Sequence, residues 1–208
     1  MKRVPLIPTA IVALAVAAMI ALGLWQLLIR RPAKLAYIAQ VRGNPSKPPI
    51  AFPTPPDDAL LFRRATGLCV EPTAIRTEGA GSAGFRLIAE CRTGGADGPG
   101  MLVQLGTTRS PDAQAAWRGG EVSGHLTHAP DRRSAIGSLF DRAPRRLMLV
   151  SDRPLAGLRP NAPPDPGNVS DPHLSYAFQW FFFAASAATI YALALRRRGR
   201  LPSPARPR

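Results

Sequence analysis

The stretch PHLSYAFQWFFFAASAATIYALALRRR, residues 172–198, decides the fold of this chain. No charged residue lies between 177 and 195, and these roughly 19 residues make about 28 Å of helix at about 1.5 Å per residue. Because the hydrocarbon core of a bilayer is about 30 Å thick, the stretch predicts a transmembrane helix, which we place at 176–195. Aromatic and polar residues precede it and arginines follow it, as at the two boundaries of a membrane span.

A second apolar run lies near the start of the chain, from Pro8 to Ile29. A signal peptide has an apolar core of about 7–15 residues and then a small-residue cleavage site. This run is longer, at roughly 21 residues, and it closes on WQLLI, although the Ala-Val-Ala at 15–17 would permit cleavage. We favour an uncleaved transmembrane helix at 9–29, with Trp25 at the membrane interface.

The charge distribution sets the expected orientation and excludes one class of partner. The formal net charge is +14, but all 13 acidic residues lie between Asp57 and Asp171, and both ends of the chain carry only basic residues. Clustering at span boundaries is typical of membrane proteins, and no nucleic-acid motif accompanies it, so we expect no nucleic-acid partner. Six arginines follow Leu195 (196, 197, 198, 200, 206 and 208), which predicts a cytoplasmic tail at 196–208.

Two spans place the N-terminal residues 1–8 on the cytoplasmic side as well, and the residues between the spans in a periplasm-like space. Arg30, Arg31 and Lys34 oppose this orientation locally. We keep it because the C-terminal cluster is larger and long loops translocate largely regardless of charge. The resulting divisions are a surface helix and proline-rich linker (30–58), a periplasmic β-rich domain (59–154) and a loop that enters the second span (155–175).

The predicted strands lie within the central domain. Phe85, Leu87, Ala89 and Cys91 alternate with polar residues, and a glycine-rich turn at 94–100 would join this strand to a short apolar one at 101–105. Further candidate strands are 68–75, 122–127 and 146–150, and a helical turn is expected at 110–118. The predicted fold class is therefore an α+β membrane protein, in which two transmembrane helices flank a small antiparallel β-sheet or partly open barrel.

The cysteines and two of the histidines carry weak signals. Cys69 and Cys91 are the only cysteines, and in an oxidising compartment they would either bridge neighbouring strands or be two small buried residues. His125 and His128 resemble a metal-ligand pair, but a spacing of three on a strand puts them on opposite faces. No nucleophile elbow, phosphate-binding loop or carboxylate pair is recognisable, so nothing recommends an enzyme.

The third histidine is the candidate ligand. On a helix that starts near Pro172, His173, Tyr176 and Trp180 share one face, at the end of the span where Trp25 also lies. An imidazole beside aromatic rings is suited to axial ligation of a haem iron. The ordinary alternative is an interfacial histidine within an aromatic belt. Two glutamines, Gln26 and Gln179, either bind a ligand or form hydrogen bonds between the spans.

Two motifs in this order resemble the surfeit locus protein one family of cytochrome c oxidase assembly factors. LGLWQLLIRRPAKLAYIAQ, residues 22–40, is similar to the family's Leu-Gly-x-Trp-Gln signature, and PHLSYAFQWFFFA, residues 172–184, to its His-Leu-x-Tyr-Ala and Gln-Trp-Phe segment. FRRATG at 62–67 looks like the strand that opens the family's outer domain. At 103–109 the chain departs from the family, because it keeps a glycine but lacks the Arg-Gly-Trp-x-Pro stretch.

The resemblance implies a non-enzymatic, two-span protein that assists haem a insertion into oxidase subunit I. The short basic start, without an arginine-rich and serine-rich transit segment, favours a bacterial inner membrane. The resemblance also implies membrane lipid, subunit I and haem a synthase as partners. The histidine of the second motif, His173, is then the candidate iron ligand for a transiently bound haem a, with Tyr176, Trp180 and Trp25 packing beside it. The alternatives are a cofactor-free scaffold that binds assembly intermediates through its outer sheet, and an unrelated membrane-anchored enzyme with a polar cleft in that domain.

Overall fold

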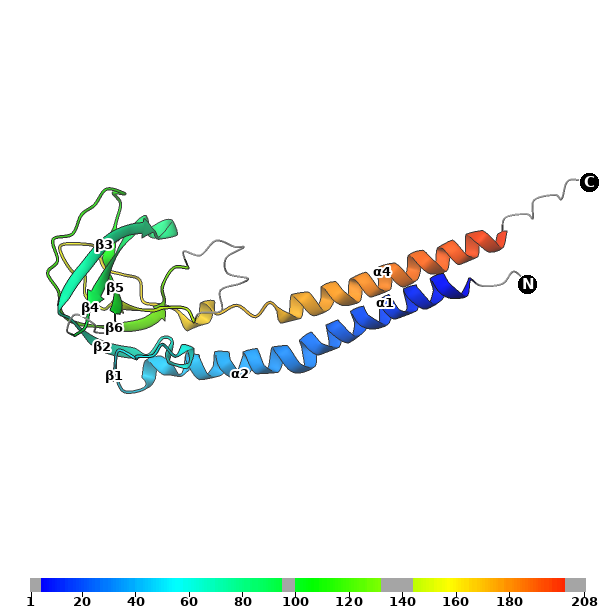
Figure 1. Ribbon diagram of the computed structural model, residues 1–208, viewed down its shortest axis with the longest axis horizontal. Helices are drawn as coiled ribbons and strands as arrows, with labels where there is room; N and C mark the ends of the chain where they lie inside the picture. Colours follow the sequence, from blue (N-terminus) through cyan, green and yellow to red (C-terminus); the bar gives the residue numbers. More distant parts are fainter. Residues whose placement is uncertain (1–4, 95–99, 132–143, 201–208) are drawn as a thin grey trace, which may run out of the picture. The chain divides into compact units, whose positions relative to one another are not determined.

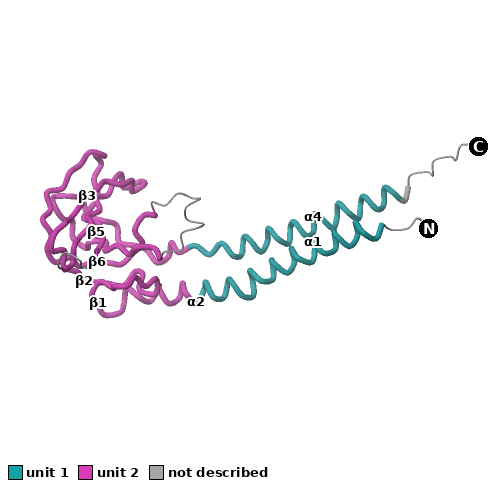
Figure 2. The backbone as a smooth tube through the Cα atoms, viewed as in Figure 1, with its two compact units in different colours: residues 1–36, 170–208 teal, residues 37–169 magenta. Residues whose placement is uncertain are grey.

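The computed structural model describes residues 5–94, 100–131 and 144–200, with side chains as far as residue 198. They form two compact units (Figures 1 and 2): unit 1 comprises 1–36 and 170–208, and unit 2 comprises 37–169. The second unit therefore includes the segments 43–58 and 155–169, which the sequence reading treats as linker and loop. Most of the expected turn at 94–100, the basic residues 2 and 3 and the tail beyond 200 lie outside the described residues.

Unit 1 is a pair of antiparallel helices, drawn in teal in Figure 2. Helix α1 spans Leu6–Trp25, a π-helical turn follows at Gln26–Arg30, and α2 spans Arg31–Arg42 without a break in the backbone. Helix α4 spans His173–Arg200. By length and composition, the described residues hold two helical stretches able to cross a membrane, one containing α1 and one containing α4, as the charge-free runs predict.

Helices α1 and α4 pack along one side of each helix, most closely at Gly23. The side of α1 facing α4 carries Thr9, Val12, Val16, Met19 and Gly23, which are buried or partly buried at alternating spacings of three and four. On α4, Ala177 and Ala184 are buried. A Cβ placed on Gly23 would lie 2.6 Å from Cε1 of Phe181, so only glycine admits this ring. Near the other end, the Thr9 and Tyr191 hydroxyls are 2.6 Å apart.

Unit 2 is built on one seven-stranded sheet with the order β1-β2-β6-β7-β5-β4-β3. The strands are β1 Ile50–Ala51, β2 Arg64–Cys69, β3 Glu71–Gly79, β4 Phe85–Arg92, β5 Gly100–Thr108, β6 Gly120–His128 and β7 Leu147–Ser151. The predicted hairpin is confirmed, because β4 and β5 pair antiparallel. The sheet is nevertheless mixed, since β1 runs parallel to β2, and β7 runs parallel to β5. All five residues of β7 are buried, as expected of a central strand.

A disulfide joins regions that are distant in the strand order. β2 and β3 are separated only by Val70, yet β2 pairs with β6 and β3 pairs with β4, so the sheet must curl until its two ends meet. At that point the Val70 N–H donates to the Arg92 carbonyl over 2.9 Å. Cys69 and Cys91 form a disulfide there, with 5.2 Å between their Cα atoms. The curled sheet thus has the partly open barrel character that the short strands predict.

Inside the curl lies a core of buried residues from β2, β4, β5, β6 and β7, including Ala89, Val103, Leu126 and Leu149. The predicted alternation in β4 continues across Ile88: Ala89 and Cys91 lie in this core, whereas Ile88 packs on the opposite face with Leu102, Met148 and Val150. The register shifts between Leu87 and Ile88, where the paired residue changes from Gly106 to Gln104 and the extra residue, Leu105, belongs to β5. Neighbouring residues of β4 are buried because both faces of the sheet are covered here.

Two expectations for unit 2 are wrong. The segment 110–118 is not helical: Ala113, Ala115 and Trp117 alternate with exposed residues, and the latter two pack against the core, which requires extended backbone. The proline-rich segment 43–58 is not a free linker either. Its Ile50–Ala51 forms β1, and the buried Asn44 amide donates to the carbonyls of Ala59 and Leu61 over 2.7 and 2.8 Å.

Candidate functional site at the start of helix α4

Four polar side chains meet where α4 begins. The Oε1 atom of Gln26 lies 2.7 Å from Nδ1 of His173. The Arg31 guanidinium forms an ion pair with Asp171, with 3.2 Å between Nε and Oδ2. The other oxygen of Asp171 accepts the backbone N–H of His173 over 3.3 Å. The first N–H groups of a helix have no intrahelical partner, so this carboxylate satisfies one of them and complements the helix dipole.

The π-helical turn brings two residues of the first helix to this cluster. In a regular α-helix, residues five positions apart, such as Gln26 and Arg31, point about 140° away from each other. Here the Arg31 N–H donates to the Gln26 carbonyl, which closes a wider turn than the α-helical one. Gln26 can therefore contact His173 while Arg31 contacts Asp171. Single π-helical turns occur frequently at functional sites, and this one lies within the first sequence motif.

The aromatic residues predicted for the site flank this cluster. Tyr176 is 51% exposed, and Trp180 is partly buried with an edge-to-face contact to Phe183 at 6.3 Å. Trp25 is 43% exposed, and the Arg30 guanidinium lies over its ring at 5.5 Å. The structure places His173, Tyr176 and Trp180 at the first turns of α4 and Trp25 next to Gln26. Among the described residues, it shows no ring contact that joins Trp25 to the three α4 residues.

The donor set at this cluster fits a haem iron of the kind that the motifs imply. With Gln26 accepting through Oε1, this hydrogen bond occupies Nδ1 of His173, and in that tautomer Nε2 has the lone pair that a metal ion needs. Within the described part of the chain, Nε2 forms no hydrogen bond. A neutral imidazole whose other nitrogen is already bonded is the usual form of a metal-ligating histidine. The half-exposed rings nearby provide apolar surface for a porphyrin.

The other histidines are engaged elsewhere, in unit 2. His125 Nδ1 lies 3.0 Å from Asp152, and His128 Nε2 lies 2.8 Å from Asp58. These different partners agree with the prediction that His125 and His128, three residues apart on one strand, point to opposite faces of the sheet. Nowhere in 5–94, 100–131 or 144–200 do three or more His, Cys, Asp or Glu side chains gather as they would around a metal ion.

Unit 2 also holds a charged cluster on β3 and β4. Arg76 forms ion pairs with Glu90 and with Glu78, and Arg146 approaches Glu90 at 3.4 Å. The hydrogen bond from Arg76 lowers the pKa of Glu90 and outweighs the effect of burial, which raises it. Burial alone lowers the pKa of Arg76, but its bonds to Glu90 and Glu78 raise it above the ordinary value. The cluster therefore favours both charged forms and cross-links two strands.

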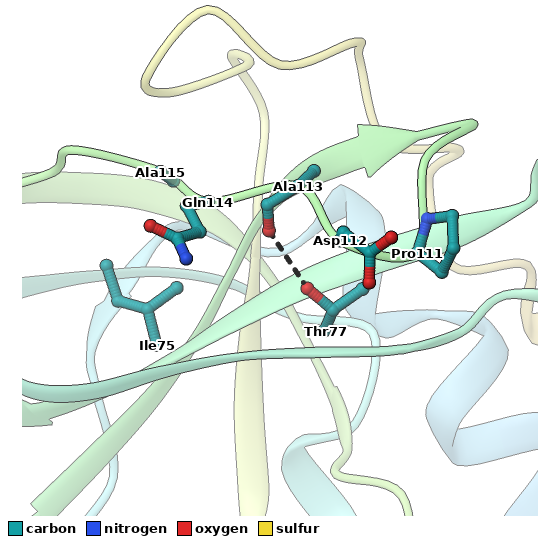
Figure 3. Close-up of a pocket in the computed structure, with 7 residues that line it drawn as sticks. All are labelled: Ile75, Thr77, Pro111, Asp112, Ala113, Gln114 and Ala115. Carbon is teal, nitrogen blue, oxygen red and sulfur yellow. Dashed lines mark hydrogen bonds between the residues drawn. The ribbon is translucent and has the colours of Figure 1, made fainter.

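A shallow pocket lies between β3 and the segment 111–115 (Figure 3). The Thr77 hydroxyl donates to the Ala113 carbonyl over 3.2 Å and ties this segment to the strand. Asp112 is the single titratable group among the residues that line it, which are Ile75, Thr77, Pro111, Asp112, Ala113, Gln114 and Ala115. The Thr77 hydroxyl therefore bonds a backbone carbonyl within this lining and not a side-chain base.

Part of this site escaped sequence reasoning. A hydrogen bond between the two helices is one of the two predicted roles of Gln26, and the structure confirms it. Gln179 is exposed on α4. The Arg31–Asp171 pair was not anticipated, although each residue lies just outside an apolar run, and such a position could have suggested the pairing. Gly106 is the glycine that the chain shares with the family at 103–109. The structure explains this glycine, because a Cβ at this position would lie 2.6 Å from Leu158.

The comparisons with known proteins agree with the sequence motifs. The family model described as SURF1 family matches residues 13–185, which include both helical motifs and all of unit 2. No curated protein matches the chain. No solved structure matches it either. With its family match and its two helical stretches able to cross a membrane, the chain belongs to the SURF1 family, whose members are membrane-bound, generally non-enzymatic factors for the assembly of cytochrome oxidase.

Proposed function

We propose that this protein holds haem a transiently at the start of α4 and assists its insertion into subunit I of cytochrome c oxidase. His173 would ligate the iron through Nε2, with Tyr176, Trp180 and Trp25 beside the porphyrin. Haem a synthase would supply the cofactor and subunit I would receive it. The bound group supplies the oxidase's redox chemistry only after transfer, so the task of this chain is binding and release.

The observation that carries the proposal is the hydrogen bond of 2.7 Å between Gln26 and His173. An ordinary interfacial histidine needs no partner on another helix, whereas a ligand histidine must be held in one tautomer and one orientation. The flanking rings remain half exposed, with Tyr176 at 51% and Trp25 at 43%. Exposed apolar side chains at the end of a helix pair support a site that a bulky planar molecule enters and leaves.

The proposed orientation places both termini in the cytoplasm and unit 2 in the periplasm of a bacterial inner membrane. The exposed Arg196, Arg197 and Arg198 at the end of α4 support it through the positive-inside rule. The disulfide between Cys69 and Cys91 supports it independently, since such bonds persist in the periplasm and are rare in the cytosol.

The test is haem a titration of the purified full chain in detergent. Because the chain has three histidines, each can be replaced in turn: His173→Ala, with His125→Ala and His128→Ala as matched controls. We expect His173→Ala alone to shift the Soret band and weaken binding at least about tenfold, as expected for the loss of an axial ligand. An unchanged Soret band and affinity in His173→Ala would exclude the ligand assignment.

The second candidate function is a cofactor-free scaffold that binds assembly intermediates by strand addition. The observation that favours it is the position of β3 at one end of the strand order, where a nine-residue strand pairs on one side with β4. Thr77 and the 111–115 segment occupy part of the other side. Purification without haem from cells that make ample haem a, together with loss of oxidase assembly when β3 carries a proline, would favour the scaffold.

A further inference from the structure

The Gln26 side chain contacts one of the two ring nitrogens of His173. Its Oε1 atom lies 2.7 Å from Nδ1. An amide oxygen has no proton to donate, so the proton of this hydrogen bond belongs to the imidazole, and a neutral ring then has its lone pair on Nε2. If the amide faced the ring with its NH₂ group instead, Nδ1 would accept and Nε2 would carry the proton. That second tautomer could not ligate a metal through Nε2.

The contacts around this hydrogen bond fix both of its partners. On the first helix, the π-helical turn that begins at Gln26 points its side chain toward α4 while Arg31 reaches Asp171. On α4, Asp171 holds the backbone N–H of His173. The Asp171 side chain is 18% exposed and the Arg31 side chain 37%, so the carboxylate is the more shielded partner of this ion pair.

We propose that Gln26 is a positioning residue that holds His173 in the Nδ1–H tautomer and presents Nε2 as the nitrogen available to an iron centre. This inference rests on the proposed function, and it assigns to the glutamine of the first motif a role toward the histidine of the second. The physical reason is general: a ligating imidazole donates its other N–H to an oxygen, which fixes the ring orientation and increases the basicity of the ligating nitrogen.

The first test measures the tautomer in the haem-free protein by ¹⁵N NMR of histidine side chains, at a pH high enough that the rings are neutral. With three histidines, the signals are assigned through the His125→Ala and His128→Ala variants. We expect Nδ1 of His173 to show a protonated shift and Nε2 an unprotonated one. Gln26→Leu should move His173 toward the Nε2–H form that free imidazoles of histidine prefer, and the exposed Gln179→Leu on α4 should not.

The second test measures haem a affinity in the same variants. Gln26→Leu should weaken binding about 10- to 100-fold, as is typical when the oxygen partner of a ligating histidine is removed. Gln26→Glu should restore it, because a carboxylate also accepts the Nδ1–H. Circular dichroism and thermal unfolding show whether Gln26→Leu retains the helices, and the restored binding of Gln26→Glu separates a positioning role from a merely structural one.

The outcomes distinguish this inference from the proposed function. An Nε2–H tautomer in the wild-type protein, or a tautomer that is the same in Gln26→Leu, overturns the positioning role whatever the haem affinity. Wild-type protein that shows the Nδ1–H tautomer but takes up no haem a would overturn the proposed function and leave the tautomer assignment supported. If Gln26→Leu and wild type bound haem a with equal affinity, the role of Gln26 in positioning His173 for iron ligation would be overturned.

Discussion

Replacing Gly23 by alanine should destabilise the helix pair, because the Phe181 ring packs against this position. The added Cβ of Gly23→Ala would lie 2.6, 2.8 and 3.0 Å from three carbons of the Phe181 ring. Carbon atoms in contact prefer about 3.5–4.0 Å, so the two helices must separate by about 1 Å or the ring must leave its rotamer.

The change in the free energy of unfolding caused by Gly23→Ala follows from two opposing effects. Overpacking of this kind costs about 1–3 kcal/mol, and a separation of about 1 Å also weakens neighbouring contacts along the helix pair. Alanine is a better helix former than glycine by about 1 kcal/mol, which offsets part of that loss. We expect Gly23→Ala to lower the free energy of unfolding of unit 1 by about 1–2 kcal/mol. In a Phe181→Ala background, the same substitution should instead raise it by up to about 1 kcal/mol, because only the propensity effect remains.

The assay is equilibrium unfolding in mixed micelles with increasing dodecyl sulfate, followed by the fluorescence of Trp25 and Trp180 in a Trp117→Phe background. The four proteins of the double-mutant cycle give the coupling between Gly23 and Phe181 directly. Ala21→Gly, at an exposed position of the same helix, measures the alanine–glycine difference without a contact. If Gly23→Ala stabilised the protein equally with and without the Phe181 ring, the reasoning about the close approach would be refuted.

Two further predictions concern unit 2. Replacing both cysteines by serine should lower the free energy of unfolding by about 3 kcal/mol, because the disulfide closes a loop with a sequence separation of 22 residues; an unchanged denaturant midpoint would contradict this. The Arg76 hydrogen bond lowers the pKa of Glu90 below its ordinary 4.5, so the carboxylate contributes stability that is fully present above pH 4.5 and is lost as the pH falls through its folded-state pKa. Glu90→Gln should therefore flatten the acid side of the stability–pH profile, and an identical slope in wild type and variant would count against the pair.

The helices were more predictable than the site they form. The charge-free runs determine α1 and α4 because a membrane span needs little more than length and apolar composition. The partnership of Gln26 with His173 depends in addition on a π-helical turn, and no residue pattern in WQLLIR announces one. The same turn brings Arg31 to Asp171, which is why that ion pair was missed although both residues border the spans.

In unit 2, the local sequence pattern predicts individual strands, whereas the order of the strands in the sheet depends on pairing between distant segments. The alternation in β4 and the apolar β5 were sufficient to predict their hairpin. The insertion of β7 between β5 and β6, with a parallel pairing on one side, depends on contacts between segments far apart in the chain. In the segment 110–118, tertiary packing likewise overrides local composition. Ala115 and Trp117 pack against the core, which excludes the helical turn that the composition of the segment suggests.

The Arg31–Asp171 pair also bears on the orientation that we propose. Arg30, Arg31 and Lys34 were the local argument against a periplasmic position for this end of α1. The structure pairs Arg31 with the Asp171 carboxylate just before α4 and holds Arg30 over the Trp25 ring at the end of α1. The opposite end of α4 carries three consecutive exposed arginines. Because the charge that opposes the orientation is partly neutralised within the helix pair, the C-terminal arginines keep the larger share of the positive-inside signal.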